Sequence, residues 1–175
     1  MTDPSTDTTG SAHFGRGPVE SFWDLARFHA KLNTAPSYFG PTTLEVVPPP
    51  AWSFGATAEE ADALLALVLE GTKTATASAH ADYEVEGEPL PEAGTLGIVL
   101  DGEGHPRALV ETTDVRVVPF DEVSAEHAHL EGEGDRSLEH WRAEHERFFA
   151  EHATAGFDPS MLLVLERFRV VYAGD

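Results

Sequence analysis

Lys73 is the residue best suited to chemistry in this sequence, because lysine is rare here and its neighbours are small or hydroxylated. The chain of 175 residues has only two lysines and a formal net charge of -20, and Lys73 lies in the segment GTKTATAS, residues 71–78. No acidic residue follows it before Asp82. A half-buried lysine in such a segment must pair with a carboxylate from elsewhere in the fold, lose its proton or contact a ligand. The alternative is an exposed strand lysine beside a helix C-terminus, where the helix dipole favours a cation.

A second candidate site is the segment EGEGDRS, residues 131–137, in which glycines separate acidic side chains. Glycine allows the backbone to approach a ligand closely, and carboxylates can act as general acids or bases. Asp135 and Ser137 have a structural alternative, since either can cap the helix that follows. Glu131 and Glu133 have no such alternative, so we predict that they belong to the site.

Metal and cofactor chemistry is not predicted. Five histidines lie between residues 127 and 152, but none forms the His-Glu-x-x-His pattern of a zinc site, and the chain has no cysteine. No glycine pattern matches a nucleotide-binding fingerprint either. Among the aromatic residues, Trp141 and Phe149 have the helical spacing of core residues, whereas Tyr83 is the better candidate for a pocket in which a base could stack.

The composition limits the possible partners. Asp and Glu number 31 against 11 Lys and Arg, so the protein repels polyanions, and duplex DNA is not an expected partner. A pocket that binds one base or nucleotide remains possible, because contacts inside a cleft need no basic surface. The first residues lack the blocks of a signal peptide, and no run approaches the roughly 20 apolar residues that span a bilayer, so we expect a soluble cytoplasmic protein without membrane contact.

The pattern of elements predicts an α+β fold, a small and mostly antiparallel β-barrel flanked by helices. A disordered tail (1–17) should precede a helix and a proline-rich strap (18–50), and the remainder (51–175) should form one domain. Thr57 and Glu60 form a capping box that begins a helix, and Gly71 ends that helix. The other expected elements are strands at 72–79, 95–100, 106–118 and 161–171, with a tight hairpin turn at 101–104, and helices at about 120–130 and 137–151. Within a regular strand Lys73 and Thr76 would face opposite sides, so they can meet only if the strand bends or bulges.

Three motifs together resemble a known family. They are Gly71-x-Lys73-x-x-Thr76 after a capped helix, the strand 110–115, and His127-Ala128-x-x-Glu131 before a helix. In this order and spacing they are similar to the ASCH domain, a member of the PUA-like β-barrel superfamily, over roughly residues 52–172. The segments WSFG (52–55) and EGEGD (131–135) resemble its longer bacterial branch.

The resemblance implies a cleft for RNA or a modified nucleoside. Some small members hydrolyse the amide of N4-acetylcytidine through a Lys, a Thr and a Glu, and these match Lys73, Thr76 and Glu131. This sequence has Ser78 where those members have an arginine. We therefore expect Lys73, Thr76 and Glu131 to be catalytic, without a cofactor or metal.

The remaining predicted contacts are to the substrate, a modified nucleoside or single-stranded RNA. The residues assigned to substrate binding are Ser78, Tyr83, Glu133 and Arg136. Two alternatives to amide hydrolysis stay open. One is a ribonuclease that acts on single-stranded RNA, and the other is a non-catalytic module that binds RNA or a nucleotide.

Overall fold

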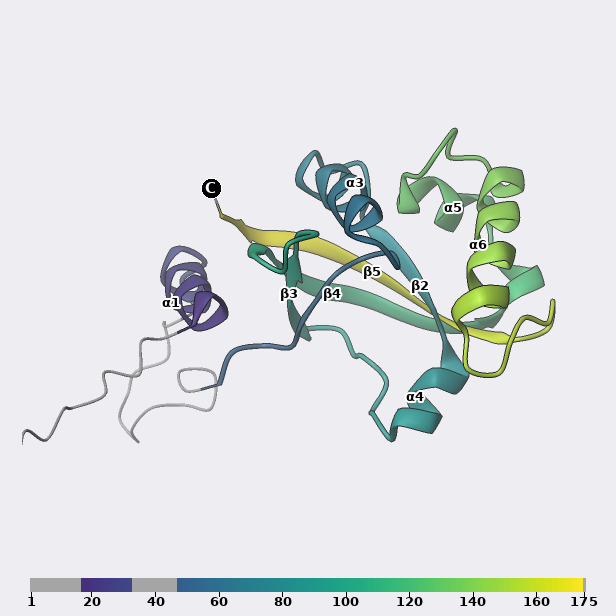
Figure 1. Cartoon of the computed structure of the whole chain (residues 1–175), viewed down its shortest axis with the longest axis horizontal. Coiled ribbons are helices and arrows are strands. Elements are labelled where there is room, and N and C mark those ends of the chain that lie inside the picture. The colour runs from purple at the N-terminus through teal and green to yellow at the C-terminus, as the bar shows by residue number, and fades with distance from the viewer. Residues whose placement is uncertain (1–16, 33–46, 175) are drawn as a thin grey trace, which may run out of the picture.

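The computed structural model describes residues 17–32 and 47–174 (Figure 1). The predicted tail, apart from Gly17, and most of the predicted proline-rich strap lie outside these residues. The helices are α1 (Pro18–His29), α3 (Ala58–Leu69), α4 (His80–Glu86), α5 (Ala125–Glu131) and α6 (Leu138–His152), with a short 3-10 helix at Phe120–Glu122. The strands are β1 (Ala51–Trp52), β2 (Ala75–Ala79), β3 (Leu96–Leu100), β4 (Pro106–Pro119) and β5 (Leu162–Ala173).

The strands form one five-stranded sheet in the order β1-β3-β4-β5-β2. All neighbouring pairs are antiparallel except β1 and β3, which are parallel. The predicted α+β class is therefore confirmed. The predicted barrel needs a correction, because β1 and β2 stand at opposite ends of the order and the sheet is open rather than closed by hydrogen bonds.

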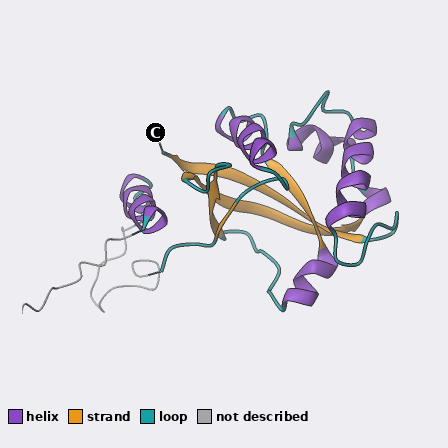
Figure 2. Cartoon of the chain, in the orientation of Figure 1, coloured by secondary structure: helices purple, strands orange, loops and turns teal. Residues whose placement is uncertain are grey.

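Helices lie around the sheet (Figure 2). The buried apolar side chains form three clusters. On one side α1 packs Phe22 and Trp23 against Ile98 of β3 and Leu109 of β4. α3 covers a second region with Leu65 and Val68. α5 and α6 gather at the far end of the sheet from α1 (Figure 1), where Trp141 and Phe149 pack against β5. The site described below lies where the regions covered by α3 and α6 meet.

Several local predictions are confirmed, because they depend on contacts within a few residues. The Thr57 hydroxyl accepts from the Glu60 amide at 3.2 Å, and the Glu60 carboxylate accepts from the Thr57 amide at 3.2 Å. Gly71 has the left-handed φ of 77° expected after a helix. The turn after Asp101 joins β3 to β4 as an antiparallel hairpin.

Two predicted elements were wrong in their extent, and one helix was missed. The strand expected at 72–79 begins only at Ala75, because the amides of Thr72 and Lys73 donate to the Leu67 carbonyl and so end the preceding helix. The helix expected at 120–130 is divided into the 3-10 helix and α5, which begins where Ser124 caps the His127 amide. α4 was not predicted, since seven residues are too few to show an apolar period.

Gly132 fixes the distance between the loop after α5 and the segment that carries Lys73. Its φ is 77°, and a Cβ at this position would lie 2.6 Å from the Thr72 carbonyl oxygen and 3.1 Å from the Lys73 nitrogen. Nearby, the Thr74 amide donates to the Leu130 carbonyl at 2.8 Å. Only glycine allows this approach. The segment 131–137, called the glycine loop below, therefore brings the carboxylates of Glu131 and Glu133 to Lys73.

Gly132→Ala should destabilise the fold more than Gly71→Ala. Both glycines have a φ of 77°, but a Cβ at Gly71 meets nothing within 4 Å. The matched variant therefore loses only the left-handed preference, about 1–2 kcal/mol, whereas Gly132→Ala adds a backbone clash. Urea unfolding of both variants measures the difference, and equal losses would contradict the close approach at Gly132.

Candidate functional site

Lys73 is buried and paired with two carboxylates. Its side chain is 1% exposed, and Nζ lies 2.7 Å from Oε1 of Glu133 and 3.3 Å from Oε2 of Glu131. Nζ also lies 5.2 Å from the centroid of the Phe54 ring, within cation–π range. An exposed strand lysine is therefore excluded, and the partners are the two glutamates of the glycine loop.

Glu131 is the centre of this buried network. Its carboxylate is 1% exposed. Oε1 accepts a hydrogen bond from Trp141 Nε1 at 2.8 Å and lies 2.9 Å from His127 Nε2. Oε2 lies 3.3 Å from Lys73 Nζ and 3.3 Å from His145 Nε2. Four side chains from three segments, namely α5, α6 and the segment between α3 and β2, therefore converge on one carboxylate.

This environment keeps Glu131 ionised. Burial by itself would raise the pKa of the Glu131 carboxyl, but the charge of Lys73 and hydrogen bonds from His127 and His145 outweigh that effect. The pKa consequently lies well below its usual value of 4.5. Glu131 is thus a fixed anion, whereas Glu133, with a side chain 28% exposed, is the more accessible carboxylate beside Lys73.

The network lies at one end of a cleft with two connected cavities. The smaller, about 300 Å³, is lined by Lys73, Thr76, Glu131 and Glu133. The larger, about 440 Å³, is lined by Thr76, Ser78 and Tyr83. The two share Phe54, Gly55, Thr76, Ala77, Phe148 and His152, so they form one cleft with Thr76 at the junction. Lys73 and Thr76 can face a common space because Lys73 lies before β2 begins. The alternation of side chains along a strand therefore does not place the two residues on opposite faces.

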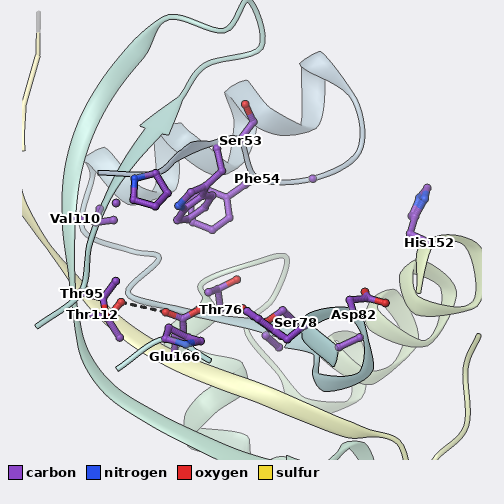
Figure 3. Close-up of a pocket in the computed structure, with 18 of the residues that line it drawn as sticks. Ser53, Phe54, Thr76, Ser78, Asp82, Thr95, Val110, Thr112, His152 and Glu166 are labelled. Atoms are coloured by element: carbon purple, nitrogen blue, oxygen red, sulfur yellow. Dashed lines mark hydrogen bonds between the residues drawn. The ribbon is translucent and has the colours of Figure 1, made fainter. Parts of the chain in front are cut away.

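The larger cavity has an aromatic side and a polar side. Trp52 and Phe54 belong to the aromatic side, with ring centroids 4.5 Å apart. In Figure 3, Phe54 lies across the cavity from Thr76 and Glu166. Ser78 Oγ and the Tyr83 hydroxyl are 3.1 Å apart. Burial raises the pKa of the Tyr83 hydroxyl, the hydrogen bond with Ser78 lowers it, and the charge of Glu166 contributes to the rise.

The structure brings together six of the seven predicted site residues. Lys73, Thr76, Ser78, Tyr83, Glu131 and Glu133 all line the cleft. Arg136 does not line either cavity. Its backbone has a positive φ of 64°, and its Nε donates to the His129 carbonyl at 3.0 Å. Arg136 therefore contacts the backbone of α5 and helps to hold the glycine loop, and it does not contribute to the cleft.

Sequence reasoning missed four polar groups of the cleft and its network. His127 lies four residues before Glu131 on α5, a spacing that could have indicated the contact. Trp141 and His145 have the same spacing on α6, but nothing in the sequence shows that both point to Glu131. Glu166 is an acidic residue in β5, where the neighbouring residues 162–165 and 168 are apolar. An acidic residue in an apolar stretch of strand was the available signal.

Neither a metal site nor a membrane span is present in the described residues. No group of three or more His, Cys, Asp or Glu side chains among them could hold a metal ion. In the same part of the chain, no helix has the length and apolar character needed to cross a membrane.

The fold and cleft are those of a known family. The ASCH domain model matches residues 50–172, and the chain belongs to the ASCH domain family. This confirms the resemblance seen in the motifs. The fold is of the PUA-like type associated with RNA binding. A comparison with curated proteins gave no match.

Two bacterial crystal structures are similar to this chain. One is an ASCH domain from Lactobacillus crispatus, with 30% identity and a TM-score of 0.74, covering 91% of this chain and 98% of that one. The other is a protein of Enterococcus faecalis, with 37% identity and a TM-score of 0.73, covering 87% of each chain. The open sheet and its helices therefore belong to a fold already seen in bacteria.

Glu131→Gln should lower the stability of the fold by about 3 kcal/mol, because it removes the anion that compensates buried Lys73. The pKa of Glu131 is depressed in the folded state, so the stability it contributes is present above pH 4.5 and is lost as the pH falls through the folded value. The variant should consequently lose stability less steeply in acid than the wild type. Urea unfolding from pH 3 to pH 8 measures both effects.

Glu122→Gln is the matched control, since Glu122 is exposed and lines neither cavity. Its unfolding free energy should stay within about 0.5 kcal/mol of the wild type. Equal stability and equal acid sensitivity in Glu131→Gln and the wild type would contradict the central role of this carboxylate.

Proposed function

We propose that this protein hydrolyses the amide of an N4-acylated cytidine or a closely related pyrimidine nucleoside. The observation that carries the proposal is the position of Thr76 at the junction of the cleft, between the buried Lys73 network and the larger cavity with aromatic and hydrogen-bonding walls. A base in the larger cavity would present its exocyclic acyl group to Thr76. The smaller cavity then has room for the acyl group beside Lys73.

The residues can perform acyl transfer without a cofactor. The proton of Lys73 passes to Glu133, 2.7 Å away, which leaves a neutral amine and a neutral carboxyl. The amine takes the proton of Thr76 as its oxygen attacks the acyl carbon, and the Glu133 carboxyl gives its proton to the departing amine. This forms a Thr76 ester, releases the cytidine amine and returns Lys73 and Glu133 to their charged forms. Water then hydrolyses the ester.

Glu131 has a positioning role in this mechanism. The sequence predicts Glu131 as a catalytic residue, but its depressed pKa and its four contacts make it a poor proton donor. It holds the Lys73 amine between the two carboxylates, in reach of the space beside Thr76. Glu133 is the better shuttle because one side of it is accessible to the cleft.

Hydrolysis of N4-acetylcytidine by the purified protein tests the proposal, with cytidine and acetate separated by chromatography. Thr76→Val and Lys73→Met should each reduce the rate about 100-fold or more, because they remove the nucleophile and its base. The controls are Lys31→Met, which changes the other, exposed lysine, and Thr113→Val, which changes an exposed threonine outside both cavities. Absence of turnover in the wild type, or full turnover in Lys73→Met, would overturn the proposal.

The charges of the cleft favour a nucleoside over RNA. Two acidic side chains line the larger cavity and five line the smaller one, against only two cations. Both cations are paired, Lys73 with Glu131 and Glu133, and Arg147 with Glu144. A phosphate would therefore meet no free cation in this cleft, and the ribonuclease alternative has no group to neutralise the phosphate charge.

A 5′-monophosphate should bind more weakly than the matching nucleoside, by about 1 kcal/mol for one additional like charge near the cleft. The difference should shrink as salt is added, because the repulsion is screened. Calorimetric titration with cytidine and cytidine 5′-monophosphate at two salt concentrations measures it. Tighter binding of the monophosphate, or cleavage of an oligoribonucleotide that disappears in Lys73→Met, would favour the ribonuclease instead.

Non-catalytic binding is the second candidate, favoured by one observation. Lys73 is held between two carboxylates, and the Ser78 hydroxyl is hydrogen-bonded to the Tyr83 hydroxyl. These polar groups already have partners in the cleft, which favours binding of a ligand without reaction. Binding of N4-acetylcytidine without turnover, under conditions in which Thr76→Val binds equally well, would select this function.

A further inference from the structure

The larger cavity contains an acid that the proposed hydrolysis does not use. Glu166 belongs to β5 and is the direct partner of Thr76 across the β2–β5 ladder. Direct cross-strand partners project their side chains to the same side, about 5 Å apart. Glu166 therefore lies beside Thr76 on the wall of the cavity, as Figure 3 shows.

The carboxyl of Glu166 is held on one oxygen only. The Thr112 hydroxyl donates to Oε2 at 3.0 Å. Thr112 reaches it from β4 beside a bulge, where the register shifts between Thr112 and Asp114. Within residues 17–32 and 47–174, no cation pairs with Glu166 and no other hydrogen bond reaches its carboxyl. Oε1 is thus available to a ligand in the cavity.

The surroundings shift the Glu166 carboxyl towards its neutral form. Burial raises the pKa of the Glu166 carboxyl above its usual value of 4.5, and the single hydrogen bond from Thr112 offsets this only in part. Glu131 shows the opposite outcome in the same cleft, because a lysine, two histidines and a tryptophan contact it. A neutral carboxyl has one donor and one acceptor side by side, unlike a carboxylate, which only accepts.

We propose that Glu166, in its neutral form, reads the pairing edge of a cytosine ring that lies against Trp52 and Phe54. The Glu166 O–H donates to ring N3, and Oε2, with its second lone pair, accepts from the N4–H beside it. Uracil presents a donor at N3 and an oxygen at position 4, so it would need the proton on Oε2 instead, and the Thr112 hydroxyl that donates to Oε2 opposes this arrangement. This inference names the residue that selects the base, and it rests on the proposed function only for the acyl group.

The position of Glu166 also accounts for where the acyl group would go. The N4 atom bound by Glu166 is adjacent to the cross-strand partner Thr76, so an acyl carbon on N4 lies near the Thr76 hydroxyl. The aromatic side of the cavity supplies stacking surface for the ring. Base recognition and acyl attack therefore use neighbouring residues on one face of two strands.

Binding of unmodified cytidine and uridine tests the inference separately from hydrolysis, because neither ligand has an amide to cleave. Calorimetric titration of the wild type should show cytidine bound about tenfold or more tightly than uridine, as expected for a bidentate contact. Glu166→Gln should keep that preference, since the Thr112 hydroxyl would hold the amide oxygen as the acceptor for N4–H and leave the amide nitrogen to donate to N3. Glu166→Ala should lose it, while Glu122→Gln should match the wild type.

The pH dependence separates a neutral carboxyl from other causes. In the wild type the affinity for cytidine should fall as the pH rises through the raised pKa of Glu166, because the donating form is lost. In Glu166→Gln the affinity should not change over this range. Asp82, Tyr83 and His152 are the other titratable groups that line this cavity, and a pH dependence that persists in Glu166→Gln would assign it to one of them and overturn the proposal.

Two further outcomes would also overturn it. One is equal binding of cytidine and uridine by the wild type, or no binding of either. The other is a preference for cytidine that survives in Glu166→Ala. Thr112→Val is a second variant that tests the same contact if the Glu166 variants misfold. It removes only the hydroxyl that holds Oε2, so it should weaken cytidine binding several-fold while the fold is kept. Hydrolysis can fail in the separate assay without affecting any of these measurements.

Discussion

The buried ion pair of Lys73 with Glu131 is the interaction on which the rest of this cleft depends. A charge removed from water is tolerated only when it is paired and hydrogen-bonded. Here the segment after α3, α5 and α6 each contribute a partner to the Glu131 carboxylate. Because the pair cannot form unless these segments come together, it couples the position of the lysine to the packing of both helices at this end of the sheet.

This constraint divides the cleft into two electrostatic environments. At one end Glu131 is surrounded by donors and its pKa is lowered well below the usual range. At the other end the Thr112 hydroxyl is the one hydrogen-bond partner of the Glu166 carboxyl in the described residues, and burial raises the pKa of that carboxyl. The surroundings therefore shift the pKa values of two carboxyls in one cleft in opposite directions, and the proposed reading of the base by Glu166 uses this difference. Thr76 lies between them, at the junction of the two cavities.

The local features of the fold could be predicted where a short range of sequence decides them. The capping box of Thr57 and Glu60, the left-handed Gly71 and the hairpin after Asp101 all follow from contacts within a few residues. The start of β2 could not be predicted, because Thr72 and Lys73 are drawn into the helix end by the Leu67 carbonyl. Closure of the sheet was also beyond the sequence, since it depends on whether strands far apart in the chain pair with one another.

For the site, the sequence by itself determined which residue types were unusual: a rare lysine, two glutamates among glycines and a threonine three residues after the lysine. It also determined membership of the ASCH family, because the order and spacing of short motifs are properties of the chain. Only the tertiary structure decided which partners Lys73 has, that Arg136 serves the loop instead of the cleft, and that Glu166 lies beside Thr76. The physical reason is that burial and hydrogen bonding, which set the charge of each carboxyl, arise from residues up to about ninety positions away and exist only after the strands have paired.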